Sequence, residues 1–307
     1  MAVQLPLFIA LLAGLGLAAE LVARGTEELE RSLGQGISGG IVLGLLVALP
    51  ETIVVVVAVL NRSYDVAVGA AIGGNVLIFT IGLGILGLAY FLRWGKTLDM
   101  RGDYRIEYYF VLVSTLFLIP VSLYGHLDRA SGGALVFLYA FYVYYRVSRS
   151  KMQRAGPVRK LRVGVLLVAG VILMTFLSDP FVHSIDSLST STGIQAGWLA
   201  LVVTPFGSEI GELVSTFRLS VRTQMGGSLS VVGLAGAKIQ NATFLMGVIG
   251  LLSSGAVPLR PVLPDIGATV VAGLLGVAVL LDGRLGVRDS ALLLAMYFVL
   301  VLASYFV

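Results

Sequence analysis

The chain is a succession of long apolar runs separated by short polar connections. Runs long enough to cross about 30 Å of hydrocarbon as helices fall at ten places, namely 3–23, 36–60, 66–92, 105–125, 131–147, 161–178, 194–220, 227–253, 264–282 and 288–307. The pattern therefore predicts an all-α integral membrane protein with ten transmembrane helices. No basic segment precedes the first run, so we interpret it as a mature helix and not as a cleaved signal.

The longest polar connection, RVSRSKMQRAGPVRKLR at 146–162, falls between the fifth and sixth runs. It divides the chain into an N-terminal five-helix half at 1–147, a basic linker at 148–160 and a C-terminal five-helix half at 161–307. Because five is an odd number, the two halves must enter the membrane from opposite sides. The sequence thus predicts two inverted-topology repeats.

Basic residues indicate which side is cytoplasmic. If the basic linker is cytoplasmic, the same side also receives Arg24, Arg31, Arg93, Lys96, Arg101, Arg105, Arg218, Arg222, Arg284 and Arg288. The other side receives Arg62, Arg129 and Arg260. This asymmetry follows the positive-inside rule and predicts a multi-pass protein of the cell membrane with both termini extracytoplasmic.

Composition excludes a soluble domain. Of the 307 residues, 57% are hydrophobic and only 12% are charged, and the mean hydropathy of +0.96 lies outside the range of soluble proteins. The lipid bilayer is therefore an expected partner. The net charge of +4 follows from the topology and gives no reason to expect nucleic acid. The chain has no cysteine, and both histidines, His126 and His183, fall in predicted loops.

Two runs carry proline and glutamate near their middle. The second reads GLLVALPETIVVVVAVL and the seventh reads VVTPFGSEIGELVSTF. Proline removes a backbone donor, so helices 2 and 7 are predicted to be broken near the bilayer centre. A broken helix at that depth faces protein or a water-filled cavity, where its freed backbone groups can bind an ion. The residues concerned are Pro50 and Glu51, and Pro205, Glu209, Gly211 and Glu212, with Pro50, Pro205 and Gly211 as candidate gating positions.

The runs that follow these two also correspond. Residues 65–84 match residues 228–247 when Gly73 is set on Gly236, which places Asn75 on Lys238 and Ile78 on Asn241. Both Asn75 and Lys238 then lie ten residues from the start of the run, about 15 Å into the membrane at 1.5 Å per residue. The glycine-rich faces are expected to pack closely on neighbouring helices.

Five residues able to hold charge or coordinate an ion are expected to meet at this depth: Glu51, Glu209, Glu212, Asn75 and Lys238. Each intramembrane charge costs about 2.5–3.5 kcal/mol on insertion scales, so stability gives no reason to keep them. Glu209 and Glu212 are three residues apart and are expected to share a helix face, as are Lys238 and Asn241.

Other polar segments have simpler interpretations. We interpret EELE at 27–30 as a cytoplasmic helix end and FLYAFYVYYR at 137–146 as an interfacial aromatic belt. Asp65 and Asp179 are expected to be loop or helix-cap residues.

The sequence resembles the calcium/cation antiporter superfamily, which includes sodium/calcium and calcium/proton exchangers. LPETIVVVVAVLNRSYDVAVGAAIGGN at 49–75 is similar to the first of that family's two repeats. GSEIGEL and GAKIQ, within 207–247, resemble the second more loosely. The resemblance implies that Glu51 and Glu212 bind the metal ion, calcium, and exchange it for protons or sodium. It implies no resident cofactor.

The flanking positions depart from the family pattern. Where the family usually has Thr, Ser, Ser and Asn, the first half has Val47, Ala48, Gly74 and Ile78, and the second half has Ser208, Glu209, Ala237 and Asn241. Most of the side-chain ligands needed for several separate sodium positions are therefore missing. This favours proton coupling, because a carboxylate can itself take the proton. Ser208, Gln240 and Asn241 remain candidate ion-binding residues.

Three interpretations of Lys238 stay open at this point. It is a fixed counter-ion for the carboxylates, or it exchanges protons or ion-pair partners during the cycle. In the third interpretation it snorkels or pairs with Glu209 and has no role in transport.

Rival functions are also open to different degrees. An intramembrane enzyme is disfavoured, because the predicted spans hold no histidine or cysteine and the aspartates fall at predicted helix ends. A sodium/calcium exchanger, a passive cation channel and a transport-inactive homologue whose site is occupied by Lys238 are the alternatives. The sequence leaves the oligomeric state open.

Overall fold

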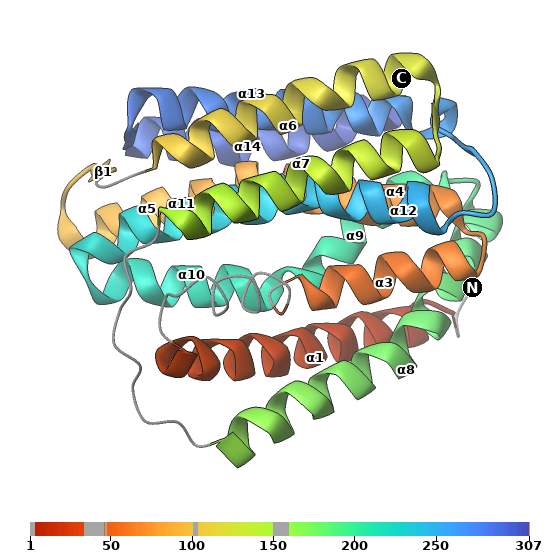
Figure 1. Ribbon diagram of the computed structural model, residues 1–307, viewed down its shortest axis with the longest axis horizontal. Helices are drawn as coiled ribbons and strands as arrows, with labels where there is room; N and C mark the ends of the chain where they lie inside the picture. The colour runs from red at the N-terminus through yellow and green to blue at the C-terminus, as the bar shows by residue number, and fades with distance from the viewer. Residues whose placement is uncertain (1–3, 34–45, 47, 101–103, 150–159, 307) are drawn as a thin grey trace.

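Helices that run roughly parallel along the long axis build almost the whole molecule in the computed structural model (Figure 1). It describes residues 4–33, 46, 48–100, 104–149 and 160–306. The predicted N-terminal part of the second run and most of the 148–160 linker lie outside these residues. The N-terminal half contains α1 (Gln4–Leu33), α3 (Leu49–Leu60), α4 (Tyr64–Leu77), η1 (Ile78–Gly82), α5 (Leu83–Trp94), α6 (Arg105–Tyr124) and α7 (Arg129–Ser148).

The C-terminal half follows the same order. It contains α8 (Lys160–Thr192), α9 (Ala196–Ser208), α10 (Ile210–Arg222), α11 (Gln224–Gln240), η2 (Asn241–Leu245), α12 (Met246–Leu252), η3 (Arg260–Val262), α13 (Leu263–Asp282) and α14 (Val287–Phe306). Within the described residues, seven helices are long and apolar enough to cross a membrane, and α3 and α9 are shorter apolar helices. The chain is therefore an all-helical membrane protein.

A π-helical turn interrupts one long helix in each half. Both π-turns, η1 and η2, begin at residues that the sequence alignment equates, Ile78 and Asn241. In each turn a threonine, Thr80 or Thr243, donates its hydroxyl to the carbonyl four residues earlier. Isolated π-turns inside α-helices are frequent at functional sites.

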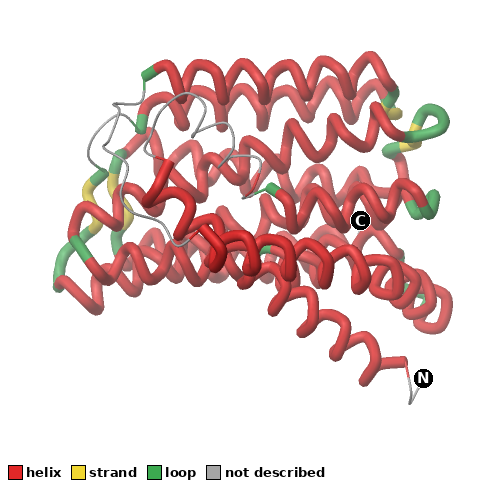
Figure 2. Tube along the Cα trace, turned by 60° about the horizontal axis from the view of Figure 1, so that its bottom comes forward, coloured by secondary structure: helices red, strands yellow, loops and turns green. Residues whose placement is uncertain are grey.

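Short strand pairs join the two halves at opposite ends of the bundle (Figure 2). One pair is β1 (Leu98–Asp99) with β4 (Arg284–Leu285), and the other is β2 (His126–Leu127) with β3 (Val257–Pro258), both antiparallel. The helices that precede β2 and β4 end in Gly125 and Gly283, whose φ angles of 83° and 69° are left-handed. Glycine adopts this conformation without steric cost, which fixes where α6 and α13 end.

The predicted close packing of glycine faces is confirmed where α4 meets α9. A Cβ at Gly69 would lie 2.1 Å from the carbonyl oxygen of Gly197, and one at Gly73 would lie 2.3 Å from that of Leu201. The two backbones therefore touch directly. Along the lower edge of Figure 1, α1 packs along α8. This pair of helices covers α3, α9 and α10.

The sixth helix is longer than predicted. α8 continues to Thr192 instead of ending near 178, so Asp179 and His183 lie inside a helix and not in a loop. The polar Ser, Thr and Asp content of this segment suggested a connection. However, apolar side chains continue at helical spacing, with Phe181 and Ile185 buried, and the ring of Phe181 stacks on Phe8 with 5.6 Å between centroids. Tertiary contacts with α1 hold the segment helical past Pro180.

The aromatic segment of α7 is only partly interfacial. Tyr139 and Tyr142 are buried, whereas Phe137, Phe141 and Tyr144 are exposed. The interpretation of 137–146 as a belt is therefore wrong for the two buried tyrosines, because that face of α7 packs against Phe110 of α6 and Phe244 of η2.

Candidate functional site

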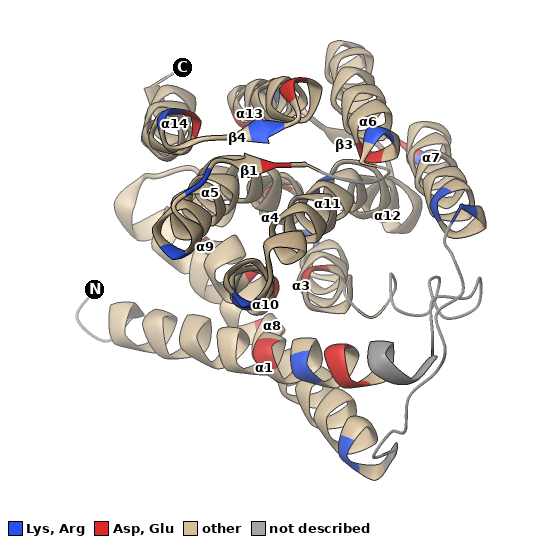
Figure 3. Ribbon diagram, turned by 90° about the vertical axis from the view of Figure 1, so that its left-hand side faces the viewer, with Lys and Arg blue, Asp and Glu red and all other residues tan. Residues whose placement is uncertain are grey.

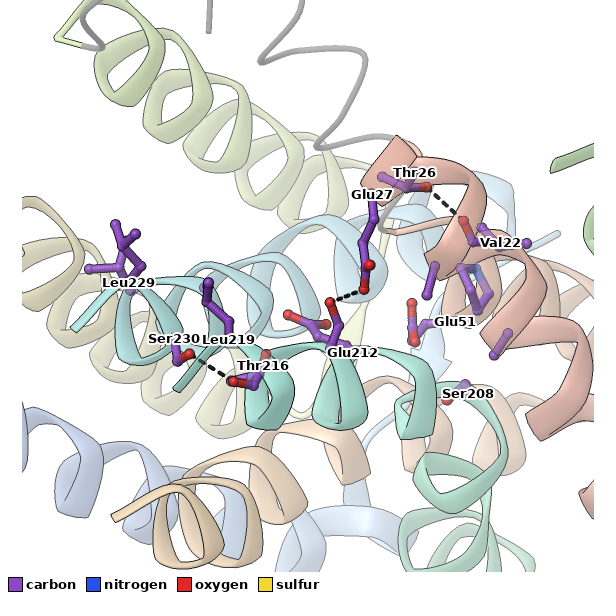
Figure 4. A pocket seen from close by; sticks show the side chains of 16 residues that line it. Val22, Thr26, Glu27, Glu51, Ser208, Glu212, Thr216, Leu219, Leu229 and Ser230 are labelled. Carbon is purple, nitrogen blue, oxygen red and sulfur yellow. Dashed lines mark hydrogen bonds between the residues drawn. The ribbon is translucent and has the colours of Figure 1, made fainter. Parts of the chain in front are cut away.

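A cavity of about 340 Å³ lies between α1, α3, α10 and α11. Three carboxylates face it, those of Glu27, Glu51 and Glu212 (Figure 4). The other described residues that line it are apolar or small, or carry hydroxyls, and none of them is basic. The hydroxyl residues are Thr26, Ser208, Ser215, Thr216 and Ser230. The cavity therefore has the charge and the oxygen ligands that suit a hard cation.

Glu51 and Glu212 reach the cavity from the first turns of two helices. Pro50 and Glu51 lie in the first turn of α3, and Glu212 lies in the first turn of α10. Proline is tolerated there because the first N–H groups of a helix have no partner within it. The positive end of the helix dipole also favours an anion in this turn. Glu51 is only 5% exposed.

The seventh predicted helix is interrupted at Glu209. α9 ends at Ser208 and α10 begins at Ile210, and the chain changes direction between them (Figure 1). Glu209 and Glu212 have different surroundings. Glu209 is 1% exposed and accepts a 2.6 Å hydrogen bond from Nδ2 of Asn241, whereas Glu212 lines the cavity.

Gly74 makes room for the pair formed by Glu209 and Asn241. A Cβ at Gly74 would lie 2.1 Å from Oε1 of Glu209 and 2.4 Å from Nδ2 of Asn241. The side chain absent from the first repeat at this position is thus compensated by two polar side chains from the second repeat. Glu209 also lies close enough to Glu51 and Glu212 for its charge to act on both.

Lys238 is fully buried and faces away from the cavity. Its Cε lies 3.1 Å from where a Cβ of Gly273 would be, next to Thr115, so the side chain points toward α6 and α13. Its Nζ has no hydrogen-bond partner among the described residues. Lys238 therefore neither reaches the membrane surface nor pairs with Glu209 in this conformation. Asn241, three residues later, contacts a different neighbour, since its Nδ2 donates to Glu209.

The remaining predicted residues divide between the cavity and the helix contacts around it. Ser208 and Pro50 line the cavity. Asn75 is fully buried, and its amide has no partner within the described part of the chain. Gln240 accepts a 3.3 Å hydrogen bond from the hydroxyl of Tyr139. Gly211 packs on α1, where a Cβ would lie 3.1 Å from the carbonyl oxygen of Ala19.

The sequence profile of the Sodium/calcium exchanger protein family matches residues 3–148 and again residues 163–306. Together these segments make up nearly all of the chain. The chain belongs to the sodium/calcium exchanger protein family. It is accordingly a cation exchanger of the membrane and not an enzyme.

Two curated proteins are similar to parts of the chain. The exchanger is 26% identical over 241 residues to Inner membrane protein YrbG of Escherichia coli K12, covering 72% of this chain and 70% of that protein. It is 24% identical over 144 residues to the Ca(2+)/H(+) antiporter ChaA of Bacillus subtilis, covering 46% of this chain and 40% of that protein.

Among solved structures, the H+/Ca2+ exchanger CAX matches with a TM-score of 0.82 at 20% identity, covering 97% of this chain and 82% of that one. Native YfkE matches with a TM-score of 0.76 at 18% identity, covering 100% and 93%. The sodium-calcium exchanger NCX_Mj matches with a TM-score of 0.65 at 19% identity, covering 98% of each chain. At these identities the structural matches establish the fold of the exchanger.

Sequence reasoning missed one carboxylate of the exchanger's cavity. The segment 27–30 is interpreted above as a cytoplasmic helix end, but Glu27 faces the cavity opposite α10. A signal was present: Ala19, Val22, Ala23, Thr26 and Glu27 recur at the spacing of one helix face. The sequence alone does not show which helix this face of α1 packs against.

Proposed function

We propose that this exchanger carries calcium, or another cation, in exchange for protons, by alternating access at the cavity. The observation that carries the proposal is that Glu51 and Glu212 face one cavity from the first turns of two helices. Two carboxylates supply two negative charges, which match one divalent cation or two protons. Hydroxyls of Ser208 and Ser215 complete an oxygen-rich surface of the kind calcium prefers.

Ten membrane-crossing segments in two inverted five-helix repeats, at 1–147 and 161–307, are part of this proposal, with helices 2 and 7 broken. The equivalent π-turns and the strand pairs at opposite ends support it. The family profile also matches each half separately. Inverted repeats around a midplane site are the usual architecture for alternating access.

The orientation of the chain in the membrane is proposed from charge. Both termini lie at one end of the bundle (Figure 1), and Lys and Arg residues gather at the opposite end (Figure 3). The positive-inside rule makes the basic end cytoplasmic. The cavity extends toward that end, because its lining includes Leu219 near the end of α10 and Leu229 near the start of α11.

Proton coupling is proposed over sodium coupling because the first repeat supplies few oxygen ligands. Ala48, Gly74 and Ile78 are buried and have no side-chain oxygen. The relative named Ca(2+)/H(+) antiporter is consistent with the same coupling. In the proposed cycle the cation binds Glu51 and Glu212 from the cytoplasmic side, and protonation from the other side accompanies its release.

Lys238 is proposed to act from the protein core, between α6 and α13, and not as a ligand of the transported cation. It does not line the cavity, so it does not occupy the cation position in this conformation. This placement favours an active exchanger over a transport-inactive homologue whose site is occupied by Lys238.

The first prediction tests the exchange itself. Purified protein in liposomes should take up radiolabelled calcium when a pH gradient is imposed, and much less when a sodium gradient is imposed. Glu212→Gln should reduce uptake to the level of empty liposomes, because the cavity loses one of its two deeper charges.

Glu28→Gln is the matched control, because Glu28 lies outside the cavity and pairs with Arg162 at 3.1 Å. Uptake driven by sodium alone would show the sodium/calcium alternative. Calcium flux that needs no counter-gradient and is not coupled to proton movement would show a channel. Absence of uptake under both gradients would contradict the calcium assignment.

A further inference from the structure

The three acidic residues of α1 whose side chains the structure describes differ in how their charge is compensated. Glu20 pairs with Arg24 at 2.8 Å and with Arg218 at 3.2 Å, and Glu28 pairs with Arg162 at 3.1 Å. Glu27 has no ion pair among the described residues. Of these three described carboxylates, Glu27 is therefore the one whose negative charge has no ion pair.

The carboxylate of Glu27 is positioned by the helix that carries Glu212. It accepts a hydrogen bond from the hydroxyl of Ser215 on α10. Ser215 lies three residues beyond Glu212, about 4.5 Å along the helix at 1.5 Å per residue. A single neutral donor leaves most of the lone pairs of the carboxylate free for another ligand.

Glu27 and Glu51 face the same cavity (Figure 4). Glu51 is nine-tenths buried, is directed into the cavity, and has no protein cation within ion-pair distance in the described part of the chain. Thr216 and Ser230 also line the cavity, and the hydroxyl of Ser230 donates to the carbonyl of Thr216 at 2.8 Å. Ser215, which holds Glu27, lies on α10 one turn beyond Glu212, so the cavity carries oxygen atoms beyond Glu51 and Glu212.

We propose that Glu27, held by Ser215, forms an outer cation-binding position on the access path, from which a cation passes to Glu212 and Glu51. This inference rests on the proposed function for its role in transport, but the outer position itself can be tested by binding alone. The ligand class is a hard divalent cation, for which carboxylate and hydroxyl oxygens are the preferred protein ligands.

The binding experiment uses purified full-length protein in detergent and radiolabelled calcium at equilibrium. A variant with Glu51→Gln and Glu212→Gln, which removes the inner position, is expected to keep one weaker saturable site. Adding Glu27→Gln should abolish that site, adding Glu28→Gln should not, and adding Glu27→Asp should retain part of the binding. Loss of all saturable binding in the double variant, or a residual site unaffected by Glu27→Gln, would overturn the proposal.

The transport experiment separates the two proposals. In the otherwise unaltered protein, Glu27→Gln should raise the apparent KM for calcium presented from the basic end by roughly tenfold, the factor that about 1.4 kcal/mol makes. An unchanged KM would overturn the role of Glu27 in transport while leaving the exchanger intact. If the unaltered protein moves no calcium but the outer site binds it, the proposed function fails and the outer site stands.

Discussion

At the scale of single residues, the core of this exchanger depends on a glycine that makes room for a charge. Gly74 sits on α4 where Glu209 and Asn241 approach it from the other half of the chain. The hydrogen bond between those two side chains is buried. Breaking a buried hydrogen bond to a charged group costs about 1.5–3 kcal/mol. A methyl group at Gly74 that separates Glu209 from Asn241 should therefore destabilise the protein by a similar amount.

Gly74→Ala is expected to lower the thermal stability of the purified protein, because the new Cβ would overlap both polar groups. Gly267→Ala is the control, since a Cβ there meets nothing within 4 Å. In a Glu209→Ala background the cost of Gly74→Ala should shrink, which a double-mutant cycle measures. An equal cost in both backgrounds would show that Gly74 does not act through Glu209.

At the scale of elements, helices of the two halves are held to each other by direct backbone contact. α7 packs on α12 through Gly132, where a Cβ would lie 2.8 Å from the carbonyl oxygen of Gly247 and 3.0 Å from Cα of Gly250. The start of α7 is fixed by a capping box between Asp128 and Ser131. Hydrogen bonds from the backbone N–H and hydroxyl of Ser131 hold the pKa of Asp128 below its usual value.

Two neighbouring glycines of α7 make a matched test of this packing. Gly132→Ala should destabilise the protein by about 1–3 kcal/mol through overpacking. Gly133→Ala, where a Cβ meets nothing within 4 Å, should be neutral or stabilise it by up to about 1 kcal/mol through helix propensity. Melting temperatures in one detergent would compare them. Equal effects of the two substitutions would contradict the contact between α7 and α12.

At the scale of the whole molecule, inverted repeats require equivalent connections of the two halves to lie on opposite sides of the membrane. Lys96 follows α5 in the first half, and Ser254 follows α12 in the second half. Both are exposed. Because the natural chain has no cysteine, a single introduced cysteine reports its own position without background.

Lys96→Cys and Ser254→Cys are therefore expected to react differently with a maleimide that cannot cross membranes. In intact cells Ser254→Cys should be labelled, and Lys96→Cys should be labelled only after the membrane is permeabilised. Labelling of both from the same side would contradict the inverted topology. Labelling in the reverse order would keep the inverted topology and reverse the orientation.

The sequence predicted some residues of the site and missed others. Pro50, Glu51 and Glu212 were recognised because proline and glutamate stand out in an apolar run, and the structure places all three at one cavity. Glu209 and Lys238 stood out equally, yet neither lines the cavity: Glu209 is hydrogen-bonded to Asn241, and Lys238 points toward α6 and α13. Glu27 was missed because its partners belong to a distant part of the chain.

The sequence by itself determined what depends on the periodicity and sign of its residues. It predicted a helical membrane protein and the equivalence of 65–84 with 228–247, while the exchanger family was implied by the resemblance of the motifs at 49–75 and 207–247. Only the tertiary structure decided which of the buried polar groups share a cavity, how far α8 extends, and that Glu27, unlike the other described acidic residues of α1, has no ion pair. The physical reason is that hydrophobic patterning acts along the chain, whereas a side chain's neighbours are set by helix breaks and by packing between segments far apart in sequence.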